Sequence, residues 1–258
     1  LCGHLRRYKK IVKKTYIIYD KKLNSKEMFV ICKILLASRC LTQKEMSEIL
    51  RKLIKTCIPL EDQKLITELI SNEEFHYVEP RHKVIFVDNM WEIGQAIHDQ
   101  HYIEIEYEKT KNEKTIIRKV KPAAILFSEY YFYMISFATP ELEREKFKRV
   151  EDSLLVIYRL DKIKNLKVLE ERFQVPYAER FEEGEFRKRV QFMQNGPLQK
   201  VRFKYNGKSV EEVLDRIPTS RVLQENEDGA IIEAEVFGDG IKMWIRSQGE
   251  LISEVSYR

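Results

Sequence analysis

Four residues combine positive charge with an aromatic ring in a way that suits an anionic ligand. They are Arg118, Lys121, Tyr133 and Arg159. Guanidinium and ammonium groups bind phosphate oxygens, and an aromatic ring stacks on a nucleobase. A nucleotide or a short nucleic acid is an anion that carries such a base. These four residues are therefore predicted to line one ligand-binding pocket, with the cations on phosphates and Tyr133 on a base.

Arg159 is the first candidate among the four because it ends a predicted strand, from which a guanidinium can leave the sheet and engage a phosphate bidentately. The alternative is a structural ion pair with Asp161 or a neighbouring carboxylate. Arg118 and Lys121 raise a geometric question, because residues three apart on a regular strand point to opposite faces. A bulge or the break at Pro122 would have to re-aim one of them.

A second basic group is predicted to contact nucleic acid. Its members are Arg187, Arg189, Lys200, Arg202 and Lys204. Residues 185–208 hold seven lysines and arginines against one acidic residue. The last three members share one face of a predicted strand, and such a row of cations suits phosphates. An equally weighted alternative is an edge strand that uses lysine to avoid pairing with other chains.

No catalytic or metal-binding set is visible, so neither enzyme activity nor a cofactor is expected. The Gly-Lys-Ser at residues 207–209 is not a phosphate loop, because Arg202 stands where the first glycine belongs. His98 and His101 have no carboxylate or thiol at a spacing that would complete a metal site. The four cysteines show no C-x-x-C spacing, which favours buried free thiols.

Composition indicates a globular protein in the cytoplasm. Of 258 residues, 43% are hydrophobic and 34% are charged, and no apolar run approaches the length of about 18 residues that a membrane span needs. No signal peptide is recognisable at the start. The net charge is +5, and residues 1–22 hold eight lysines and arginines against one aspartate. This basic stretch is interpreted as a strand or a solvated connector rather than a binding site.

The elements that would position these residues fall into three predicted parts of an α+β protein, at residues 1–82, 83–175 and 176–258. In the first part, helical spacing of apolar residues begins at Ser25, the expected N-cap. A capping-box pattern at Thr42 and Glu45 starts a second helix, and residues 60–70 form a third. The acidic face of the third helix favours a helical connector over a DNA-reading helix-turn-helix.

The middle part is predicted to be a small barrel, SH3-like or Sm-like, with one covering helix at residues 84–98. Five short strands are expected at residues 102–107, 115–121, 125–127, 130–138 and 154–158, with a polar turn at 109–114 and a charged loop at 140–152. The strand at residues 130–138 is apolar on both faces, which implies cover on both sides. A homodimer is therefore expected.

The last part begins with a predicted basic helix at residues 181–193 and continues as strand, helix, strand, strand, helix, strand. That order is typical of a ferredoxin-like unit. Its strands are expected at residues 198–205, 220–224, 230–237 and 251–257, and its helices at 209–216 and 239–248. Ser209 with Glu212 and Asp239 are the expected caps.

A family resemblance rests on three motifs. Arg118 lies four residues before Pro122, the triplet Phe132-Tyr133-Met134 follows about ten residues later, and Tyr-Arg-Leu-Asp-Lys-Ile occupies residues 158–163. This order resembles the WYL domain of bacterial transcription regulators. The triplet departs from the family pattern with Phe for Trp and Met for Leu, and Ala123 stands where many members have Tyr. Residues 198–249 resemble the family's C-terminal WCX extension, and residues 25–82 resemble its helical connector.

The resemblance implies that the effector is a nucleic-acid fragment or a nucleotide, bound near the basic and aromatic residues. It also implies a winged helix-turn-helix before Leu1 that binds promoter DNA under the effector's control. The expected function is therefore effector sensing and dimerisation in a transcription regulator. Alternatives are an RNA- or single-strand-binding or assembly module without a DNA reader, and a hydrolase acting on nucleotides. Residues 1–258 alone are expected to bind duplex DNA weakly and without sequence preference.

Overall fold

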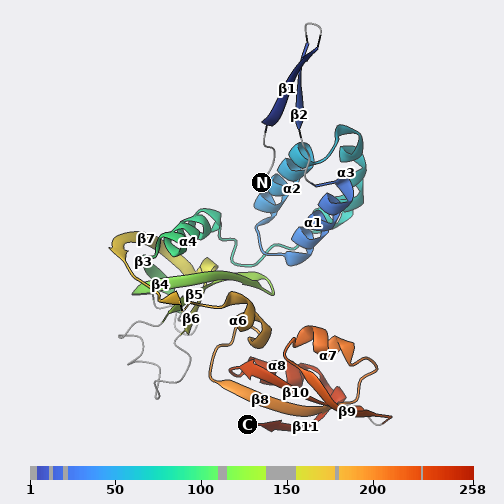
Figure 1. The fold of residues 1–258 in the computed structure, drawn as a ribbon, viewed down its shortest axis with the longest axis vertical. Coiled ribbons are helices and arrows are strands. Elements are labelled where there is room, and N and C mark those ends of the chain that lie inside the picture. Colours follow the sequence, from blue (N-terminus) through green and yellow to red (C-terminus); the bar gives the residue numbers. More distant parts are fainter. Residues whose placement is uncertain are drawn as a thin grey trace. The chain divides into compact units, whose positions relative to one another are not determined.

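A computed structural model describes residues 5–11, 14–19, 23–109, 115–137, 155–177, 180–227 and 229–258. The chain consists of two compact units, Leu1–Ile85 and Phe86–Arg258 (Figure 1). The content is α+β, with antiparallel sheets and helices. Within the described residues, no helix is both long and apolar enough to cross a membrane. The predicted loop at residues 140–152, and residues 110–114 of the predicted turn, lie outside the described residues.

The first unit holds one hairpin and three helices. Strands β1 (Leu5–Ile11) and β2 (Lys14–Tyr19) pair antiparallel, so this basic stretch contains strands. The helices are α1 (Ser25–Ser38), α2 (Gln43–Cys57) and α3 (Leu60–Phe75). They pack around a core that includes Met28, Cys57, Ile58 and Ile66.

Two capping boxes set the starts of the first two helices. Thr42 and Glu45 bond each other's backbone amides at the start of α2, which confirms the predicted cap. At α1 the N-cap is Asn24 rather than Ser25: Asn24 accepts from the backbone of Glu27, and Glu27 bonds back. The prediction of Ser25 was wrong by one residue. Asn is as good an N-cap as Ser, and Glu27 stands at the third helical position only when counted from Asn24.

The second unit begins with a five-stranded antiparallel sheet of order β6-β5-β4-β3-β7. Its strands are β3 (His101–Glu108), β4 (Thr115–Ser128), β5 (Tyr131–Phe137), β6 (Leu155–Arg159) and β7 (Ile163–Arg172). Helix α4 (Val87–Asp99) packs against β3, β4 and β7. The edge strands β6 and β7 do not pair among the described residues, so the sheet remains open there.

Strand β4 differs from the prediction of two strands separated at Pro122. It runs through Pro122 as one strand, with a bulge between Pro122 and Ala124. A bulge tolerates proline, because the ladder hydrogen bond that proline cannot donate is already interrupted there. The fifth strand is instead β7, which pairs with β3. This strand was not predicted, because β7 (Ile163–Arg172) shows little regular alternation of apolar and polar residues.

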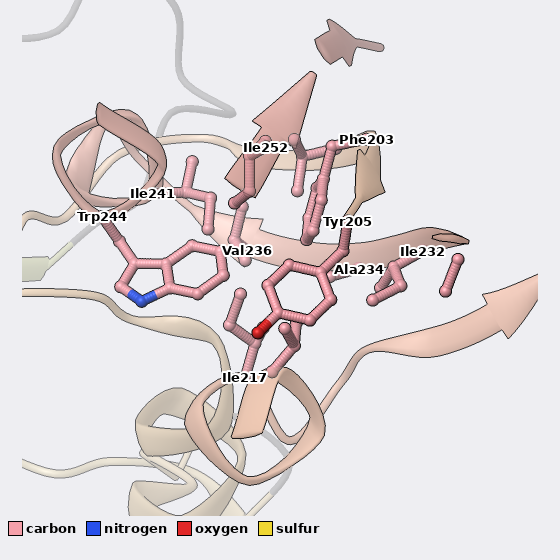
Figure 2. Packing of buried hydrophobic residues seen from close by; sticks show 12 residues of the cluster. Phe203, Tyr205, Ile217, Ile232, Ala234, Val236, Ile241, Trp244 and Ile252 are labelled. Carbon is pink, nitrogen blue, oxygen red and sulfur yellow. The ribbon is translucent and has the colours of Figure 1, made fainter. Parts of the chain in front are cut away.

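The C-terminal part holds a four-stranded sheet of order β11-β8-β10-β9. Its elements are β8 (Leu198–Tyr205), α7 (Glu211–Arg216), β9 (Arg221–Asn226), β10 (Gly229–Phe237), α8 (Gly240–Ser247), η3 (Gly249–Leu251) and β11 (Ile252–Tyr257). Asp239 is the N-cap residue of α8, as predicted, whereas the N-cap residue of α7 is Val210 rather than Ser209. Neither helix has a side-chain cap hydrogen bond. Phe203, Ile232, Val236 and Trp244 lie in the core between sheet and helices (Figure 2).

Helix α6 (Glu183–Arg189) and the residues after it connect the two sheets of this unit. The helix is shorter than the predicted range of 181–193. Phe186 and Val190 pack against Ile135 of β5, and Val190 forms a parallel bridge with Phe237 of β10. Ile135 and Met134, on opposite faces of β5, are both fully buried within this one chain. The apolar faces of β5 therefore do not require a second copy as cover, although that requirement was the reason for expecting a dimer.

Candidate functional site

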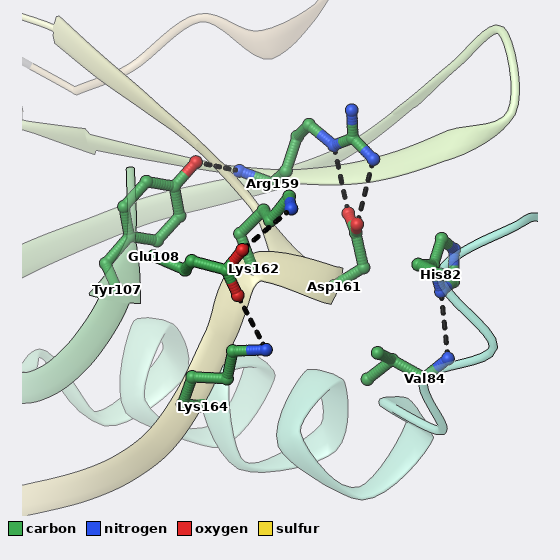
Figure 3. Close-up of polar contacts among 8 residues, drawn as sticks. All are labelled: His82, Val84, Tyr107, Glu108, Arg159, Asp161, Lys162 and Lys164. Carbon is green, nitrogen blue, oxygen red and sulfur yellow. Dashed lines mark hydrogen bonds and ion pairs between the residues drawn. The ribbon is translucent and has the colours of Figure 1, made fainter. Parts of the chain in front are cut away.

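Arg159 lies where β6 ends and η1 (Leu160–Lys162) begins. Its Nε donates to Oδ1 of Asp161 at 3.0 Å, and its Nη2 donates to Oδ2 at 2.8 Å (Figure 3). The Asp161 side chain is 3% exposed and the Arg159 side chain is 28% exposed. The backbone amide of Arg159 donates to the Tyr107 hydroxyl at 3.3 Å. The ion pair that sequence analysis kept as the alternative is therefore present, and it fixes the guanidinium at the surface.

Tyr131 and Tyr133 on β5 complete the surroundings of Arg159. The guanidinium carbon lies 3.5 Å from the centroid of the Tyr131 ring, in cation–π contact. Tyr133 is the direct cross-strand partner of Arg159, and its ring meets that of Tyr131 edge to face at 6.4 Å. Tyr131 was not among the predicted site residues, although its position two residues before Tyr133 places both rings on one face of the strand.

The electrostatics of this site keep Arg159 charged. Desolvation by itself lowers the pKa of the Arg159 guanidinium, but the hydrogen bonds to Asp161 outweigh it, and the pKa is raised. Burial raises the pKa of the Tyr133 phenol, a rise that the Arg159 cation opposes. Within the described residues, Nη1 of Arg159 makes no hydrogen bond, so this edge of the guanidinium can donate to an anion.

Two lysines extend the polar cluster beyond Arg159. Lys162 and Lys164 bind the two carboxylate oxygens of Glu108, at 3.3 Å and 2.6 Å (Figure 3). Hydrogen bonds from Lys164 and then Lys162 lower the pKa of Glu108. The cluster thus holds three cations against two carboxylates, and its excess charge is positive.

Arg118 does not lie beside Arg159. It pairs with Ile105 across the sheet and shares its strand face with the fully buried Val120. Burial raises the pKa of Tyr158 to about 12, and the Arg118 cation opposes that rise. Since Tyr158 and Arg159 are consecutive on β6, their side chains point to opposite faces. Arg118 is therefore on the face of the sheet away from the Arg159 guanidinium.

Lys121 lies on the same face as Tyr133, but further along the sheet. Its cross-strand partner is Phe137, four positions from Tyr133 on β5, and this spacing corresponds to about 13 Å. The Lys121 ammonium lies 5.8 Å from the Tyr102 ring centroid, and that of Lys119 lies 4.4 Å from it. Of the four predicted pocket residues, the structure thus brings together Tyr133 and Arg159, while Arg118 and Lys121 stand apart from them.

Comparison with known protein families adds one match. Residues 88–168 match the WYL domain. The match runs from α4 into β7 and includes Arg118, Lys121, Tyr133 and Arg159. No curated protein matches the chain.

Among solved structures, this chain is similar to proteasome accessory factor B/C (PafBC) of Arthrobacter aurescens, at 12% identity and a TM-score of 0.36. That comparison covers 88% of this chain and 30% of the PafBC chain, so the chain spans less than a third of its neighbour's length. A CRISPR Cas-related protein is similar at 16% identity and a TM-score of 0.40, with 90% of this chain and 69% of that chain covered.

Two members of the second basic group, Arg187 and Arg189, lie on α6. Arg187 donates from Nη2 to the carbonyl oxygen of Phe127 at 2.9 Å. Arg189 binds Glu185 at 2.6 Å and lies 4.0 Å from Glu235. Both arginines therefore have intramolecular contacts that a nucleic acid would have to share.

Lys200, Arg202 and Lys204 share one face of β8, as predicted, with Val201, Phe203 and Tyr205 buried on the other. The edge-strand alternative was wrong, because β8 is paired on both sides, by β10 and β11. The cross-strand partners of Lys200 and Arg202 are Glu235 and Glu233. These glutamates offset the charge of the row, which weakens its attraction for phosphates.

Proposed function

We propose that the WYL domain binds an oligonucleotide or nucleotide effector at Arg159, without turning it over. The observation that carries this proposal is the placement of Arg159, fixed between Tyr131 and Asp161 with its Nη1 edge directed away from both hydrogen bonds. A fixed guanidinium loses little conformational freedom when it binds a phosphate. The adjacent tyrosine rings suit stacking on a nucleobase. The excess positive charge of the cluster formed with Lys162 and Lys164 suits the phosphates of a nucleic acid.

The proposal extends to regulation through the resemblance of the sequence to transcription regulators. The effector would shift the DNA-binding equilibrium of a winged helix-turn-helix domain in the same protein by binding one of two arrangements more tightly. In the full-length protein, a short single strand that binds at Arg159 should then change the affinity for promoter DNA. Unchanged promoter affinity would favour the alternative of a single-strand-binding module.

The effector site is tested with the variant Arg159→Ala and a labelled single-stranded oligonucleotide. Affinity measured by fluorescence anisotropy should fall by about 1.5 to 3 kcal/mol, the range for a hydrogen bond to a charged group, and its salt dependence should flatten. Thermal stability should fall as well, because the buried Asp161 carboxylate loses its partner.

The double variant Arg159→Ala/Asp161→Ala separates the two effects. Removing both charges eliminates the unpaired carboxylate, so this variant should regain much of the lost stability. Its oligonucleotide affinity should stay low, because the guanidinium is still absent. Wild-type affinity and salt slope in the double variant would show that Arg159 serves the fold alone.

A further inference from the structure

A cavity of about 160 Å³ lies between the turn that joins β4 to β5 and the segment that runs from α6 to the end of α7. It is separate from the Arg159 hydrogen bonds and is not part of the proposed effector site. Its polar lining comes from the residues Ser128, Glu129, Arg187, Gln191 and Arg216. The cavity therefore borders both the WYL domain and the C-terminal part of the same unit.

Gln191 is the most informative residue in the lining. It is 4% exposed, yet its side-chain amide makes no hydrogen bond within the part of the chain that the structure describes. Gln191 is not among the residues whose side-chain polar atoms are both fully buried and without a partner, so its amide reaches the solvent in the cavity. With no partner in the protein, this amide is free to bind a molecule inside the cavity.

Two arginines border the same space and are held by weak or single contacts. Arg187 donates to the Phe127 carbonyl oxygen at 2.9 Å, and Arg216 lies 3.5 Å from the Glu129 carboxylate. The Arg216 guanidinium also lies 5.0 Å from the Phe192 ring. Two guanidinium groups against one carboxylate leave the cavity positive, with donor N–H groups remaining on both arginines.

The backbone around Gln191 is held in an unusual conformation. Phe192 and Met193 have φ angles of 50° and 51°. Residues other than glycine rarely adopt such positive backbone angles. The contact with Gly240 is so close that a Cβ there would lie 1.9 Å from the Gln191 carbonyl oxygen. Such strain persists where the surroundings impose it, and it is concentrated at ligand sites.

We propose that this cavity binds a phosphate group, as free phosphate or as the head of a small phosphate ester. Two guanidinium groups and one amide in the lining offer several N–H donors and a net positive charge, which suits a phosphate with its several acceptor oxygens. The cavity volume of about 160 Å³ is large enough for a phosphate group. The bound anion joins the β4–β5 turn to α6 and α7.

The test compares phosphate binding to residues 1–258 and to two variants, by thermal unfolding at constant ionic strength with chloride as the reference. Phosphate should raise the Tm of the wild type, because a ligand of the native state stabilises it. In Arg216→Gln the affinity for phosphate should be at least about tenfold weaker. Comparing the Tm shift caused by adenosine 5′-monophosphate with that caused by adenosine shows whether the phosphate of an ester also enters the cavity.

Gln191→Leu makes the test specific, because it removes the amide that faces the cavity and no hydrogen bond within the described residues. Without phosphate, the variant should melt at about the same temperature as the wild type. With phosphate, its affinity should be about tenfold weaker. A merely structural glutamine would instead lower the Tm and leave phosphate affinity unchanged.

The control is Arg221→Gln, which removes an exposed arginine of β9 that pairs with Glu233 outside the cavity. It should respond to phosphate like the wild type. The proposal would be overturned if phosphate had no effect on the wild type at millimolar concentration, or if Gln191→Leu and Arg216→Gln bound phosphate as tightly as the wild type does. Arg159→Ala should respond to phosphate like the wild type, because Arg159 does not line the cavity. The phosphate site in the cavity and the effector site at Arg159 are therefore tested independently.

Discussion

The triplet Phe132-Tyr133-Met134 contributes one residue to the candidate site and two residues to apolar packing. Tyr133 faces Arg159, whereas Met134 is fully buried and Phe132 contacts the rings of Phe86 and Phe127. The two departures from the family pattern therefore fall at positions that pack with apolar neighbours. Hydrophobic exchange at such positions changes packing rather than the chemistry of the exposed face.

Tyr158 offers a prediction about a single hydroxyl group. Its side chain is buried, and its hydroxyl has no hydrogen-bond partner within the described residues. Tyr158→Phe should therefore leave the free energy of unfolding at pH 7 unchanged or raise it by up to about 1 kcal/mol, measured by urea denaturation. A loss larger than about 1 kcal/mol would show that the hydroxyl is satisfied.

Tyr158→Phe should also change how the free energy of unfolding depends on pH in alkaline solution. The pKa of Tyr158 rises from 10 to about 12 in the folded protein, chiefly through burial. The folded state therefore holds this proton more tightly, and the associated stability is complete below pH 10 and decreases as the pH rises towards 12. Tyr158→Phe should lose less stability than the wild type across that interval.

At the scale of elements, the bulge in β4 decides which side chains share a face. Before the bulge, Arg118 and Val120 point to the side of Tyr158; after it, Ala124 and Leu126 point to the side of α6. One extra residue in a strand reverses the alternation of all residues beyond it. This reversal is why Arg118 and Tyr133 lie on opposite faces, while Lys121 and Tyr133 share one.

Helix α6 gives a prediction on pH. Hydrogen bonds from Arg189 and then Lys188 lower the pKa of Glu185 from 4.5 to about 2. The folded state therefore favours the carboxylate, and this contribution is present above pH 4.5 and is lost as the pH falls towards 2. Glu185→Gln should flatten the decrease of Tm over that range, followed by circular dichroism. Glu183→Gln, on the same helix, should retain the wild-type slope.

At the scale of the whole molecule, Phe186 connects the WYL domain to the C-terminal sheet. It is buried among Ile135, Val190 and Met193, and its ring stacks on Phe237 at 5.7 Å. Phe186→Ala should cost about 3 to 5 kcal/mol and weaken the coupling between the two sheets. Calorimetry should then resolve separate transitions for the two parts of the Phe86–Arg258 unit.

The control for this variant is Phe75→Ala in the other unit. Phe75 is 78% exposed, so its truncation should leave the unfolding of Phe86–Arg258 unchanged. A single transition in Phe186→Ala, at a reduced temperature but as cooperative as in the wild type, would show that contacts other than Phe186 couple the sheets.

The sequence by itself determined those features that depend on neighbouring residues. The capping box at Thr42, the alternation of β3 and β8, and the order of strands and helices after α6 were all predictable. Each depends on the period of apolar residues or on a bond across three residues. The N-cap of α1 was wrongly predicted as Ser25 instead of Asn24, because Ser and Asn are similarly good N-caps and do not distinguish the two positions.

Only the tertiary structure decided which distant residues meet. One pocket was predicted for Arg118, Lys121, Tyr133 and Arg159. The bulge in β4 and the register of β4, β5 and β6 bring Tyr133 and Arg159 together and place Arg118 and Lys121 elsewhere. The cavity beside Gln191 likewise requires three segments that are far apart in the chain. Strand register and packing across such distances depend on the whole fold, whereas residue types and spacing report local preference.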